Sequence, residues 1–456
     1  MEPTTLLQIA EWAGGKVVGN GDLIVSRVTT DSRQAGEGSL FVALIGERFD
    51  GHDFVKDIAK SGAVAALVRE GYGERVPGFP VIEVDDTLSG LQRLASGYRN
   101  SLSVRVVGVT GSNGKTSTKE FVYAVLAGGG KMVGAKTQGN LNNHIGVPLT
   151  LLSLEKRHAF AVVEMGMNHA GEIAPLAAMA RPEVAIITNV GVAHIEHLGS
   201  QEAIADEKGA LAQATGMEGF VVLNAGDKYA PRIAAMTSSE VVWAGVEVGD
   251  VQAVDLQVVE GGTRFGLVHE GERAEVLLGV AGRHMVCNAA LAAAAGIVMG
   301  VTLREAASGL SAFQPIAGRM QVRDLGGIKF LDDTYNANPD SMEAALVTLA
   351  QWPVVGKRIA VLGMMGELGV FAEQGHRRVG AAAAVNGVDV LVTVGREAEW
   401  IRDEALTNGC GEVKHCEDVY EAAAIVKEIA CSEDVVLVKG SRTAGMERIL
   451  SEVNKL

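Results

Sequence analysis

Short apolar runs alternate with helical patterns through the middle of the chain. From residue 104 to about 314, runs rich in Val, Ile and Leu lie at 104–110, 160–165, 184–190 and 220–226. Strands that are buried on both faces read as near-continuous apolar runs. The pattern therefore predicts a mostly parallel sheet with helices on both faces. Residues 241–279 instead alternate between apolar and polar positions, which predicts antiparallel strands added to this sheet.

The regions on either side carry α/β patterns of their own. Residues 1–84 open with a helical segment that ends at glycines, followed by β-like runs at 39–46 and 63–68. Segment 86–100 has a cap-like start and helical spacing, so we place a domain boundary before it. Strand-like runs return at 329–333, 357–363, 388–395 and 434–442. We therefore predict an α/β protein with a smaller α/β N-terminal domain (1–84), a central parallel-sheet domain (85–314) and a C-terminal Rossmann-like domain (315–456).

Length and charge agree with this division and exclude several classes of protein. A chain of 456 residues has room for about three domains, and with 48% hydrophobic and 21% charged residues it is too apolar to be disordered. The 55 acidic and 40 basic residues give a net charge of −15. This charge has the wrong sign for a general nucleic-acid or anionic-membrane binder, but it leaves room for a local basic pocket that holds a small anion.

Cysteine usage and the N-terminal segment favour a soluble cytoplasmic protein. The four cysteines, at 287, 410, 416 and 431, form no CxxC pair, so they fit a reducing compartment and carry no zinc signature. The first residues lack the basic start, apolar core and cleavage site of a signal peptide. The longest apolar run, 289–301, is too short to span a bilayer, so we expect no membrane insertion.

The strongest chemical motif lies between a predicted strand and a predicted helix and reads GVTGSNGKT, from Gly108 to Thr116. Small residues allow backbone N–H groups to close around phosphates at a helix N-terminus. Lys115 can then reach the β- and γ-phosphates, and the Thr116 hydroxyl can bind Mg²⁺. The alternative is an ordinary glycine-rich turn. Five residues separate Gly108 from the Gly-Lys pair where the usual motif has four, so this is a variant of the P-loop.

Three further residues are candidate metal ligands, each with a structural alternative. Glu164 ends the run at 160–165, where a carboxylate opposite Thr116 suits a metal, although a strand-end Glu can also be exposed to solvent. His194 follows the run at 184–190, and a lone loop His is more often a hydrogen-bonded structural residue; His197 nearby is an alternative. Lys208 lies in an acidic helical stretch, where the plain interpretation is a surface lysine.

Three residues suit a nucleotide. Asn288 lies one turn after His284 on a predicted helix, where its amide can pair with an adenine edge or cap the helix. Arg319 lies in a turn where the second and third domains meet, and a guanidinium there suits a γ-phosphate. Asp333 ends the run at 329–333, where a carboxylate can accept hydrogen bonds from ribose hydroxyls.

Taken together, these motifs resemble those of the Mur ligase family and occur in the family's order. They are TTDSR at 29–33, TGSNGKT at 110–116, TQGNLNNHIGVP at 137–148, EMGMNHAGEI at 164–173, TNVGVAHIEHLGS at 188–200, Lys208, GRHMVCNA at 282–289, AGRMQ at 317–321 and DDTYNANP at 332–339. Several independent motifs in one order are far more specific than any one of them.

The resemblance implies an ATP-dependent ligase that uses two magnesium ions. It places ATP on Gly111, Ser112, Asn113, Gly114, Lys115, Thr116, Ser117, Asn288, Arg319 and Asp333. It makes the metal ligands Thr116, Glu164, His194 and Lys208, the last as a carbamate. The residues expected to carry catalysis are then Lys115, Lys208, His194 and Arg319.

The same resemblance implies two further substrates, a UDP-N-acetylmuramoyl-tripeptide and D-alanyl-D-alanine. The residues it assigns to them are Thr30, Asp31, Ser32 and Arg33 at the UDP end, Asn140, Asn142 and Asn143 at the muramoyl part, and Tyr335, Asn336 and Asn338 in a YNANP signature. Read alone, residues 30–33 are a surface turn. His144 follows the Asn pair where a Glu is more usual. YNANP marks the branch that adds D-alanyl-D-alanine, and the DNPR motif of the branch that adds the third residue does not occur in the sequence.

The expected reaction is an amide ligation in peptidoglycan precursor synthesis, driven by cleavage of ATP to ADP and phosphate through an acyl phosphate. The alternatives are another ligase of the superfamily, such as a folylpolyglutamate synthase, and a P-loop kinase or regulatory NTPase. We expect a monomer, and the turn at 364–369 is the candidate contact for the dipeptide. The third residue of the accepted tripeptide and the general base stay open at this point.

Overall fold

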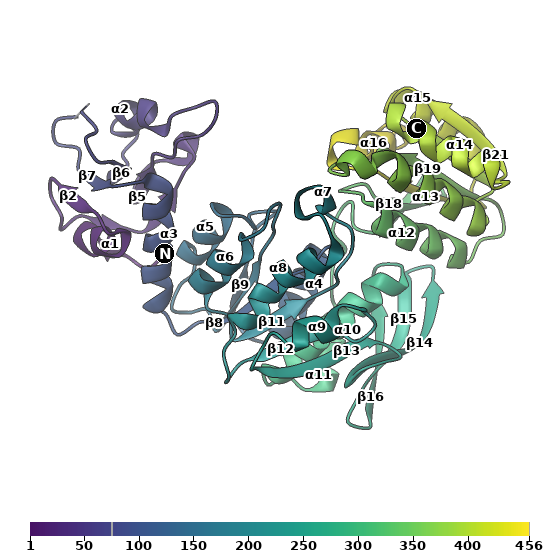
Figure 1. Ribbon diagram of the computed structural model, residues 1–456, viewed down its shortest axis with the longest axis horizontal. Coiled ribbons are helices and arrows are strands. Elements are labelled where there is room, and N and C mark those ends of the chain that lie inside the picture. Colours follow the sequence, from purple (N-terminus) through teal and green to yellow (C-terminus); the bar gives the residue numbers. More distant parts are fainter. Residues whose placement is uncertain (74–75, 456) are drawn as a thin grey trace.

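The computed structural model describes residues 1–73 and 76–455. Over these residues the chain forms three lobes in a row, which follow the order of the sequence from left to right in Figure 1. Each lobe has its own main sheet: five strands in the N-terminal lobe, nine in the central lobe and six in the C-terminal lobe. The predicted α/β class with a central parallel sheet is confirmed.

The N-terminal lobe packs two helices against a mixed sheet. Helix α1 (Leu6–Ala13) starts where the Thr5 side chain accepts a hydrogen bond from the Gln8 N–H, and it ends at Gly14, as its sequence predicts. The sheet has the order β2 (Lys16–Val18), β7 (Val81–Val84), β6 (Ala65–Arg69), β5 (Ser39–Val42) and β4 (Arg27–Thr29). The remaining elements are β1 (Thr4–Thr5), β3 (Ile24–Val25), η1 (Ser32–Gln34), η2 (Gly51–Phe54) and α2 (Val55–Ile58).

The central lobe contains the largest sheet. Its strands lie in the order β16 (Glu272–Leu278), β15 (Gly262–His269), β14 (Val251–Val259), β13 (Glu240–Val246), β12 (Phe220–Asn224), β11 (Val184–Ile187), β8 (Arg105–Thr110), β10 (Phe160–Glu164) and β9 (Gly134–Lys136). The pairings from β9 to β13 are parallel. The carboxyl ends of β8, β10 and β11 therefore meet at one edge of the sheet.

The prediction for residues 241–279 needs one correction. The pairs β14–β15 and β15–β16 are antiparallel, as predicted. However, β13 runs parallel to both β12 and β14. Alternation of apolar and polar residues indicates a half-exposed strand, but it carries no information about the direction of the neighbouring strand, which is why the prediction failed here.

Helices cover both faces of the central sheet, as the apolar runs predict. They are α4 (Lys115–Tyr123), η3 (Ala124–Gly129), α5 (Gly146–Leu152), α6 (Ile173–Ala180), α7 (Ile195–Leu198), α8 (Gln201–Gln213), α9 (Ala230–Ala234), α10 (Arg283–Val298) and α11 (Leu303–Ser311). Alternate residues of β8 belong to different cores. Val107 and Val109 pack with α4 and α10, whereas Val106 packs with α5, α6 and α8.

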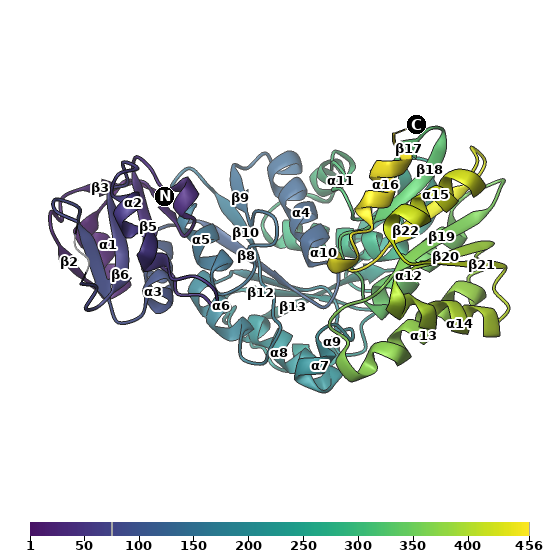
Figure 2. The same cartoon turned by 90° about the horizontal axis from the view of Figure 1, so that it is seen from above.

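The C-terminal lobe is a second, smaller α/β unit. Its sheet has the order β17 (Gln321–Leu325), β18 (Ile328–Asp333), β22 (Val435–Lys439), β19 (Arg358–Gly363), β20 (Val390–Val394) and β21 (Glu412–Cys416), with only the first pair antiparallel. Its helical segments are α12 (Pro339–Gln351), η4 (Gly369–Phe371), α13 (Ala372–Val385), η5 (Arg396–Ala398), α14 (Glu399–Thr407), α15 (Val419–Ile429), η6 (Arg442–Ala444) and α16 (Glu447–Val453). Figure 2 shows this lobe against one end of the central lobe, with the N-terminal lobe at the other.

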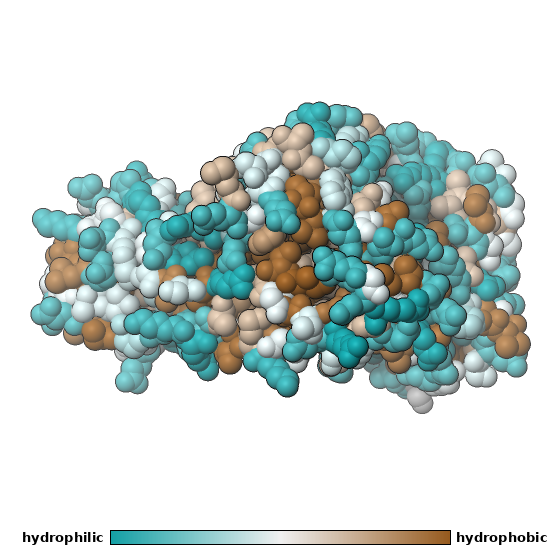
Figure 3. Space-filling model, turned by 90° about the horizontal axis from the view of Figure 1, so that it is seen from below, coloured by the Kyte–Doolittle hydropathy of each residue, from teal (hydrophilic) through white to brown (hydrophobic). Residues whose placement is uncertain are grey.

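The surface of the molecule carries both hydrophilic and apolar residues. Figure 3 shows one long face, on which hydrophilic and apolar residues are mixed and apolar residues gather near the middle. Within the described part of the chain, no helix combines the length and the apolar content that crossing a membrane requires.

Helix α3 (Thr87–Asn100) joins the N-terminal and central lobes. It starts at Asp86, whose side chain accepts a hydrogen bond from the Ser89 N–H, as the cap-like sequence predicts. Its buried Leu91 belongs to one core that runs from α1 through α3 to α5 and α6. The two lobes thus share a continuous apolar contact.

Truncation of this contact should destabilise the protein. We expect Leu91→Ala to lower the free energy of unfolding by about 2–5 kcal/mol, because it leaves a cavity in the shared core. Urea unfolding followed by circular dichroism measures the change. The control is Ser96→Ala, which shortens a half-buried side chain on the same helix. Equal unfolding midpoints for the two variants would show that α3 does not hold the lobes together.

Candidate active site

A cleft of about 600 Å³ lies between the central and C-terminal lobes. Residues from the loops after β8, β10 and β11 line it on one side, and loops of the C-terminal lobe line it on the other. It brings together most of the residues singled out in the sequence: Ser112, Asn113, Gly114, Lys115, Thr116, Ser117, Asn140, Asn142, Asn143, Glu164, His194, Asn288, Arg319, Asp333, Tyr335, Asn336 and Asn338. Parallel strands explain this convergence, because their carboxyl ends share one edge.

The glycine-rich loop packs closely against the loop that follows β11. Gly111 has φ +152°, and a Cβ atom on it would lie 1.8 Å from the Thr188 Oγ1 atom, so only glycine fits. The Thr188 hydroxyl donates to the Asn113 carbonyl at 2.5 Å. Beyond the loop, the buried amide of Asn288 on α10 lies beside Gly114. These contacts hold the loop in place, and the N-terminus of α4 that follows it lines the cleft.

Lys115 folds back over this loop. Its Nζ donates to the carbonyls of Gly111 at 2.8 Å and Ser112 at 3.3 Å. Burial lowers the pKa of the Lys115 ammonium, and Arg319 adds to the effect while Glu164 opposes it. A desolvated cation beside a helix N-terminus provides a strong attraction for phosphate oxygens.

Glu164 and Thr116 form the part of the cleft that suits a cation. The Thr116 Oγ1 lies 3.3 Å from the Glu164 Oε1, which also accepts a hydrogen bond from the Asn142 side chain at 2.8 Å. The Glu164 Oε2 is buried and accepts no hydrogen bond, with the Lys119 Nζ 3.5 Å away. Glu164 is thus almost fully buried, so its interpretation as an exposed strand-end residue is wrong.

This donor set fits magnesium. Carboxylate and hydroxyl oxygens are hard ligands, and Glu164 has an oxygen without a hydrogen bond. Over residues 1–73 and 76–455, no group of three or more His, Cys, Asp or Glu side chains is arranged to hold a metal. Mg²⁺ characteristically takes one or two protein oxygens and completes its shell with water and phosphate oxygens. Thr116 and Glu164 therefore suit a nucleotide-bound magnesium better than a site built from protein alone.

Lys208 is not a surface residue. It lies on α8 and is 1% exposed, although Asp206 and Glu207 precede it in the sequence. Burial lowers the pKa of its amine well below the ordinary value, and the nearby charge of Lys115 lowers it further. The two acids have partners of their own: Asp206 pairs with Arg232, and Glu207 accepts from the Gly171 and Ile173 N–H groups. The charge of Glu207 opposes the lowering of the Lys208 pKa.

His194 reaches the cleft and His197 does not line it. The Nδ1 of His194 lies 3.1 Å from the Oε2 of Glu367 in the C-terminal lobe, close enough for an ion pair but without the angle of a hydrogen bond. His194 and Glu367 both adopt left-handed backbone conformations, with φ 63° and 60°. His197 instead stacks on His169, with ring centroids 4.5 Å apart.

Arg319 bridges the two walls of the cleft. Its guanidinium donates to the Thr116 hydroxyl at 3.3 Å. Its other surface lies over the Tyr335 ring, 3.9 Å from the centroid, in a cation–π contact. Arg442 approaches the same ring at 5.9 Å. Arg319 thus connects the first residue of YNANP to the glycine-rich loop.

Asp333 is already paired in this arrangement. Its carboxylate accepts from the buried ammonium of Lys439 at 2.6 Å and from the Met320 N–H at 3.2 Å. Lys439 also donates to the Asn336 carbonyl at 2.9 Å. Burial lowers the pKa of the neighbouring His284 to about 4, so this wall of the cleft presents a neutral imidazole.

The asparagines expected to contact substrate have different surroundings. Asn142 donates to Glu164, and the Asn143 side chain accepts from the N–H groups of Ile145 and Gly146 at the start of α5. Asn338 caps α12 and exchanges two hydrogen bonds with Asn113. Among the described residues, the side chains of Asn140 and Asn336 have no hydrogen-bond partner, and both line the cleft.

Residues 30–33 lie in the N-terminal lobe and do not line the cleft. They form the surface turn that their sequence predicts, which includes the short helix η1. Asp31 and Arg33 pair with each other at 2.7 Å, and the hydrogen bonds from Arg33 lower the pKa of Asp31 to about 2. If this turn meets the same substrate as the cleft, the substrate must be long.

Sequence reasoning missed several residues of the site. Lys119 and Lys439 contact Glu164 and Asp333, which it had singled out, and Asp340 accepts from the Val192 N–H just before His194. Lys439 lies within the run at 434–442 and ends β22, and its place at a strand end was a usable signal. The other two lie within predicted helices, where no spacing distinguishes them from ordinary polar residues. The turn at 364–369 does reach the cleft, through Gly366, Glu367 and Leu368.

Sequence profiles of known protein families match most of the chain. A profile described as the Mur ligase middle domain matches residues 109–296. A second, described as Mur ligase, glutamate ligase domain, matches residues 318–442. A third, described as Mur ligase family, catalytic domain, matches residues 24–99.

Individual relatives match over the full length. The UDP-N-acetylmuramoyl-tripeptide–D-alanyl-D-alanine ligase of Escherichia coli (strain K12) is 37% identical, over 99% of this chain and 98% of the relative. A crystal structure of MurF from Acinetobacter baumannii has a TM-score of 0.91 at 32% identity, with 100% of each chain covered. MurF ligase from Thermotoga maritima in complex with ADP has a TM-score of 0.84 at 31% identity, over 94% of this chain and 97% of that one. This chain therefore belongs to the Mur ligase family.

Proposed function

We propose that this chain joins D-alanyl-D-alanine to the terminal carboxylate of UDP-N-acetylmuramoyl-tripeptide, with cleavage of ATP to ADP and phosphate. One observation carries the proposal: the glycine-rich loop, Glu164, Arg319 and the YNANP segment converge on a single cleft. The likeness to D-alanyl-D-alanine ligases over the whole length supports the same substrates. The product is UDP-N-acetylmuramoyl-pentapeptide, a precursor of peptidoglycan.

The first step makes the carboxylate reactive. A carboxylate oxygen of the tripeptide attacks the γ-phosphorus, the bond from that phosphorus to the β,γ-bridging oxygen breaks, and ADP leaves with the electron pair. Lys115 and the N-terminus of α4 line the cleft and would stabilise the charge that moves onto the phosphates. Arg319, held over Tyr335, reaches the same place from the C-terminal lobe.

The second step forms the amide. The dipeptide amine attacks the acyl carbon, and a tetrahedral intermediate collapses as the phosphate leaves. The nitrogen loses a proton, which solvent or the released phosphate takes up. Phosphorylation makes this step possible because phosphate is a far better leaving group than oxide.

Magnesium would bind at Thr116 and Glu164 and, when bound, would neutralise charge on the transferred phosphoryl group. His194 is the candidate contact for a second ion, because it lines the cleft and its Nδ1, which lies 3.1 Å from the Glu367 Oε2, makes no hydrogen bond to the described residues. Asn142 and Lys119 orient the Glu164 carboxylate from either side. The chain's own part is thus to fix the oxygen ligands in a dry wall of the cleft.

Lys208 would act as a carbamate. Burial lowers the pKa of the Lys208 amine and so favours its neutral form, and a neutral amine can attack carbon dioxide, form an N–C bond and release a proton. Over the described residues, its side chain has no ion pair or hydrogen bond that would hold an ammonium. The carbamate would supply anionic oxygens, which magnesium prefers to nitrogen.

The N-terminal lobe would hold the UDP end of the substrate at Thr30, Asp31, Ser32 and Arg33. The separation of this turn from the cleft supports the assignment, because the substrate is long: UDP at one end and the reacting carboxylate at the other. Asn140, which lines the cleft and has a free side chain, would then meet the muramoyl part between them.

Release of ADP tests the reaction class. We expect sustained release only when both the UDP-linked tripeptide and D-alanyl-D-alanine are present, since the acyl phosphate needs an amine to turn over. A coupled spectrophotometric assay measures it, with each substrate left out in turn. Release at the full rate without the dipeptide would point to a kinase or regulatory NTPase, and a folate substrate in place of the tripeptide would test the other rival.

Lys115→Ala should lower turnover by about 10²–10³-fold, because it removes a cation that faces the phosphates. The same coupled assay measures the loss, and circular dichroism checks that the variant is folded. Lys427→Ala is the matched control, since Lys427 is exposed on α15 far along the chain. Near-normal activity of Lys115→Ala would contradict the phosphate-binding role of the loop.

Carbon-13 NMR tests the carbamate. Protein equilibrated with ¹³C-bicarbonate should show a carbamate carbon signal, and Lys208→Met should lack it. Bicarbonate-free buffer should also reduce the wild-type turnover. A signal that persists in Lys208→Met would place the modification elsewhere, and no signal in the wild type would refute it.

A further inference from the structure

Three consecutive backbone N–H groups hold the loop between β11 and α7. Those of residues 190, 191 and 192 donate in turn to Asp227 at 2.6 Å, Ser112 at 2.8 Å and Asp340 at 2.9 Å. The three acceptors come from the loop after β12, the glycine-rich loop and α12 of the C-terminal lobe. We name residues 190–192 the clamped loop.

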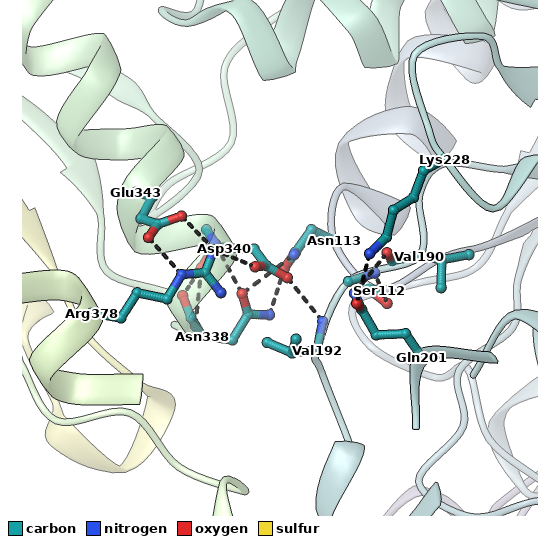
Figure 4. A network of polar contacts seen from close by, with 12 residues as sticks. Ser112, Asn113, Val190, Val192, Gln201, Lys228, Asn338, Asp340, Glu343 and Arg378 are labelled. Atoms are coloured by element: carbon teal, nitrogen blue, oxygen red, sulfur yellow. Dashed lines mark hydrogen bonds and ion pairs between the residues drawn. The ribbon is translucent and has the colours of Figure 1, made fainter. Parts of the chain in front are cut away.

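The third acceptor differs from the others because it belongs to the other lobe. Asp340 lies in the first turn of α12, and Figure 4 shows it directed at the Val192 N–H. Its second oxygen lies 3.0 Å from the guanidinium of Arg378 on α13, which Glu343 also holds. The Asp340 carboxylate is thus held from within the C-terminal lobe by one oxygen and contacts the central lobe with the other.

A second contact joins the same two surfaces. The Asn338 amide donates to the Asn113 Oδ1 at 2.7 Å, and the Asn113 amide donates back to the Asn338 Oδ1 at 3.3 Å (Figure 4). The start of α12 therefore contacts both the glycine-rich loop and the clamped loop. The glycine-rich loop lines the cleft, and the clamped loop leads into Ala193 and His194, which also line it.

The approach leaves no space for a side chain on residue 191. A Cβ atom on Gly191 would lie 2.3 Å from the Asp340 Oδ2 and 3.3 Å from the Ser112 Cβ. An alanine would have to push Asp340 away. The clamped loop therefore fits the start of α12 both in shape, at Gly191, and in hydrogen bonding, at the Val192 N–H.

We propose that Asp340 is a positioning residue for the ligation: by accepting the Val192 N–H it docks the C-terminal lobe on the clamped loop. The clamped loop leads directly to His194, and through Ser112 it touches the glycine-rich loop. Docking thus sets the position of Arg319 and the YNANP segment relative to the phosphate-binding residues. The inference rests on the proposed ligase function for its kinetic test only.

Asp340→Ala should lower kcat for ADP release about tenfold to a hundredfold, since small misplacements of reacting groups cost rates of this size. The KM for the UDP-linked tripeptide should stay near the wild-type value, because Asp340 contacts no substrate-binding residue of the N-terminal lobe. Asp340→Asn should recover most of kcat, because its amide oxygen can still accept the Val192 N–H. A wild-type kcat for Asp340→Ala would overturn the proposal, and so would an Asp340→Asn variant as slow as Asp340→Ala.

Glu343→Ala is the matched control. Glu343 lies on the same helix and pairs with the same arginine, but its contact stays within the C-terminal lobe. It should keep the wild-type kcat. A loss in Glu343→Ala equal to that in Asp340→Ala would show that the arginine network, and not the contact between the lobes, sets the rate.

Gly191→Ala supplies a test by non-additivity. Alone it should reduce kcat, and combined with Asp340→Ala it should cost little more than Asp340→Ala alone, because the clashing carboxylate is gone. Fully additive losses would contradict the docked geometry.

Amide hydrogen exchange tests the contact without the reaction. The peptide that covers residues 188–194 should exchange faster in Asp340→Ala than in the wild type or Glu343→Ala. If the wild type showed no ligation but exchange changed as expected, the proposed function would fail and the contact would stand. Unchanged exchange in an active enzyme would refute the contact alone.

Discussion

The close approach of two loops at the carboxyl edge of the central sheet is the constraint on which the site depends. The glycine-rich loop and the loop after β11 meet through the Ser112 N–H, which donates to the Asn189 carbonyl at 2.9 Å, and through the Thr188 hydroxyl. Parallel pairing of β8 with β11 enforces this meeting. The N-terminus of α4, Lys115 and Thr116 take their places from it, and the C-terminal lobe docks on the same two loops.

The side chains at this edge include cations, although the chain as a whole is negatively charged. The net charge is −15, yet Lys115 and Arg319 line one cleft, and the buried Lys208 lies close enough for the Lys115 charge to act on its amine. Removing a cation from water is costly, which is why the pKa values of both lysines fall. The same desolvation makes the site attractive to phosphate and carboxylate groups. Net charge describes the exposed surface and says little about a buried site.

Much of the site was predictable because its chemistry lies in local sequence. A glycine-rich loop between strand and helix predicts a phosphate site, and Glu164 and His194 follow strands whose ends must meet. The order of motifs extends this to the Mur ligase family. The surroundings of single residues were less predictable. Lys208 beside two acids looks like a surface lysine, and only the packing of α8 against the sheet shows that it is buried.

The elements, the phosphate-binding loop and the family could be predicted from local sequence, because periodicity and contiguous motifs act over a few residues. The tertiary structure decided the partners: Lys439 for Asp333, Asn338 for Asn113 and Asp340 for the Val192 N–H. It also decided the direction of β13. Each of these contacts joins positions that the chain brings together only on folding. Local spacing carries no record of such pairs, because they depend on how the lobes pack.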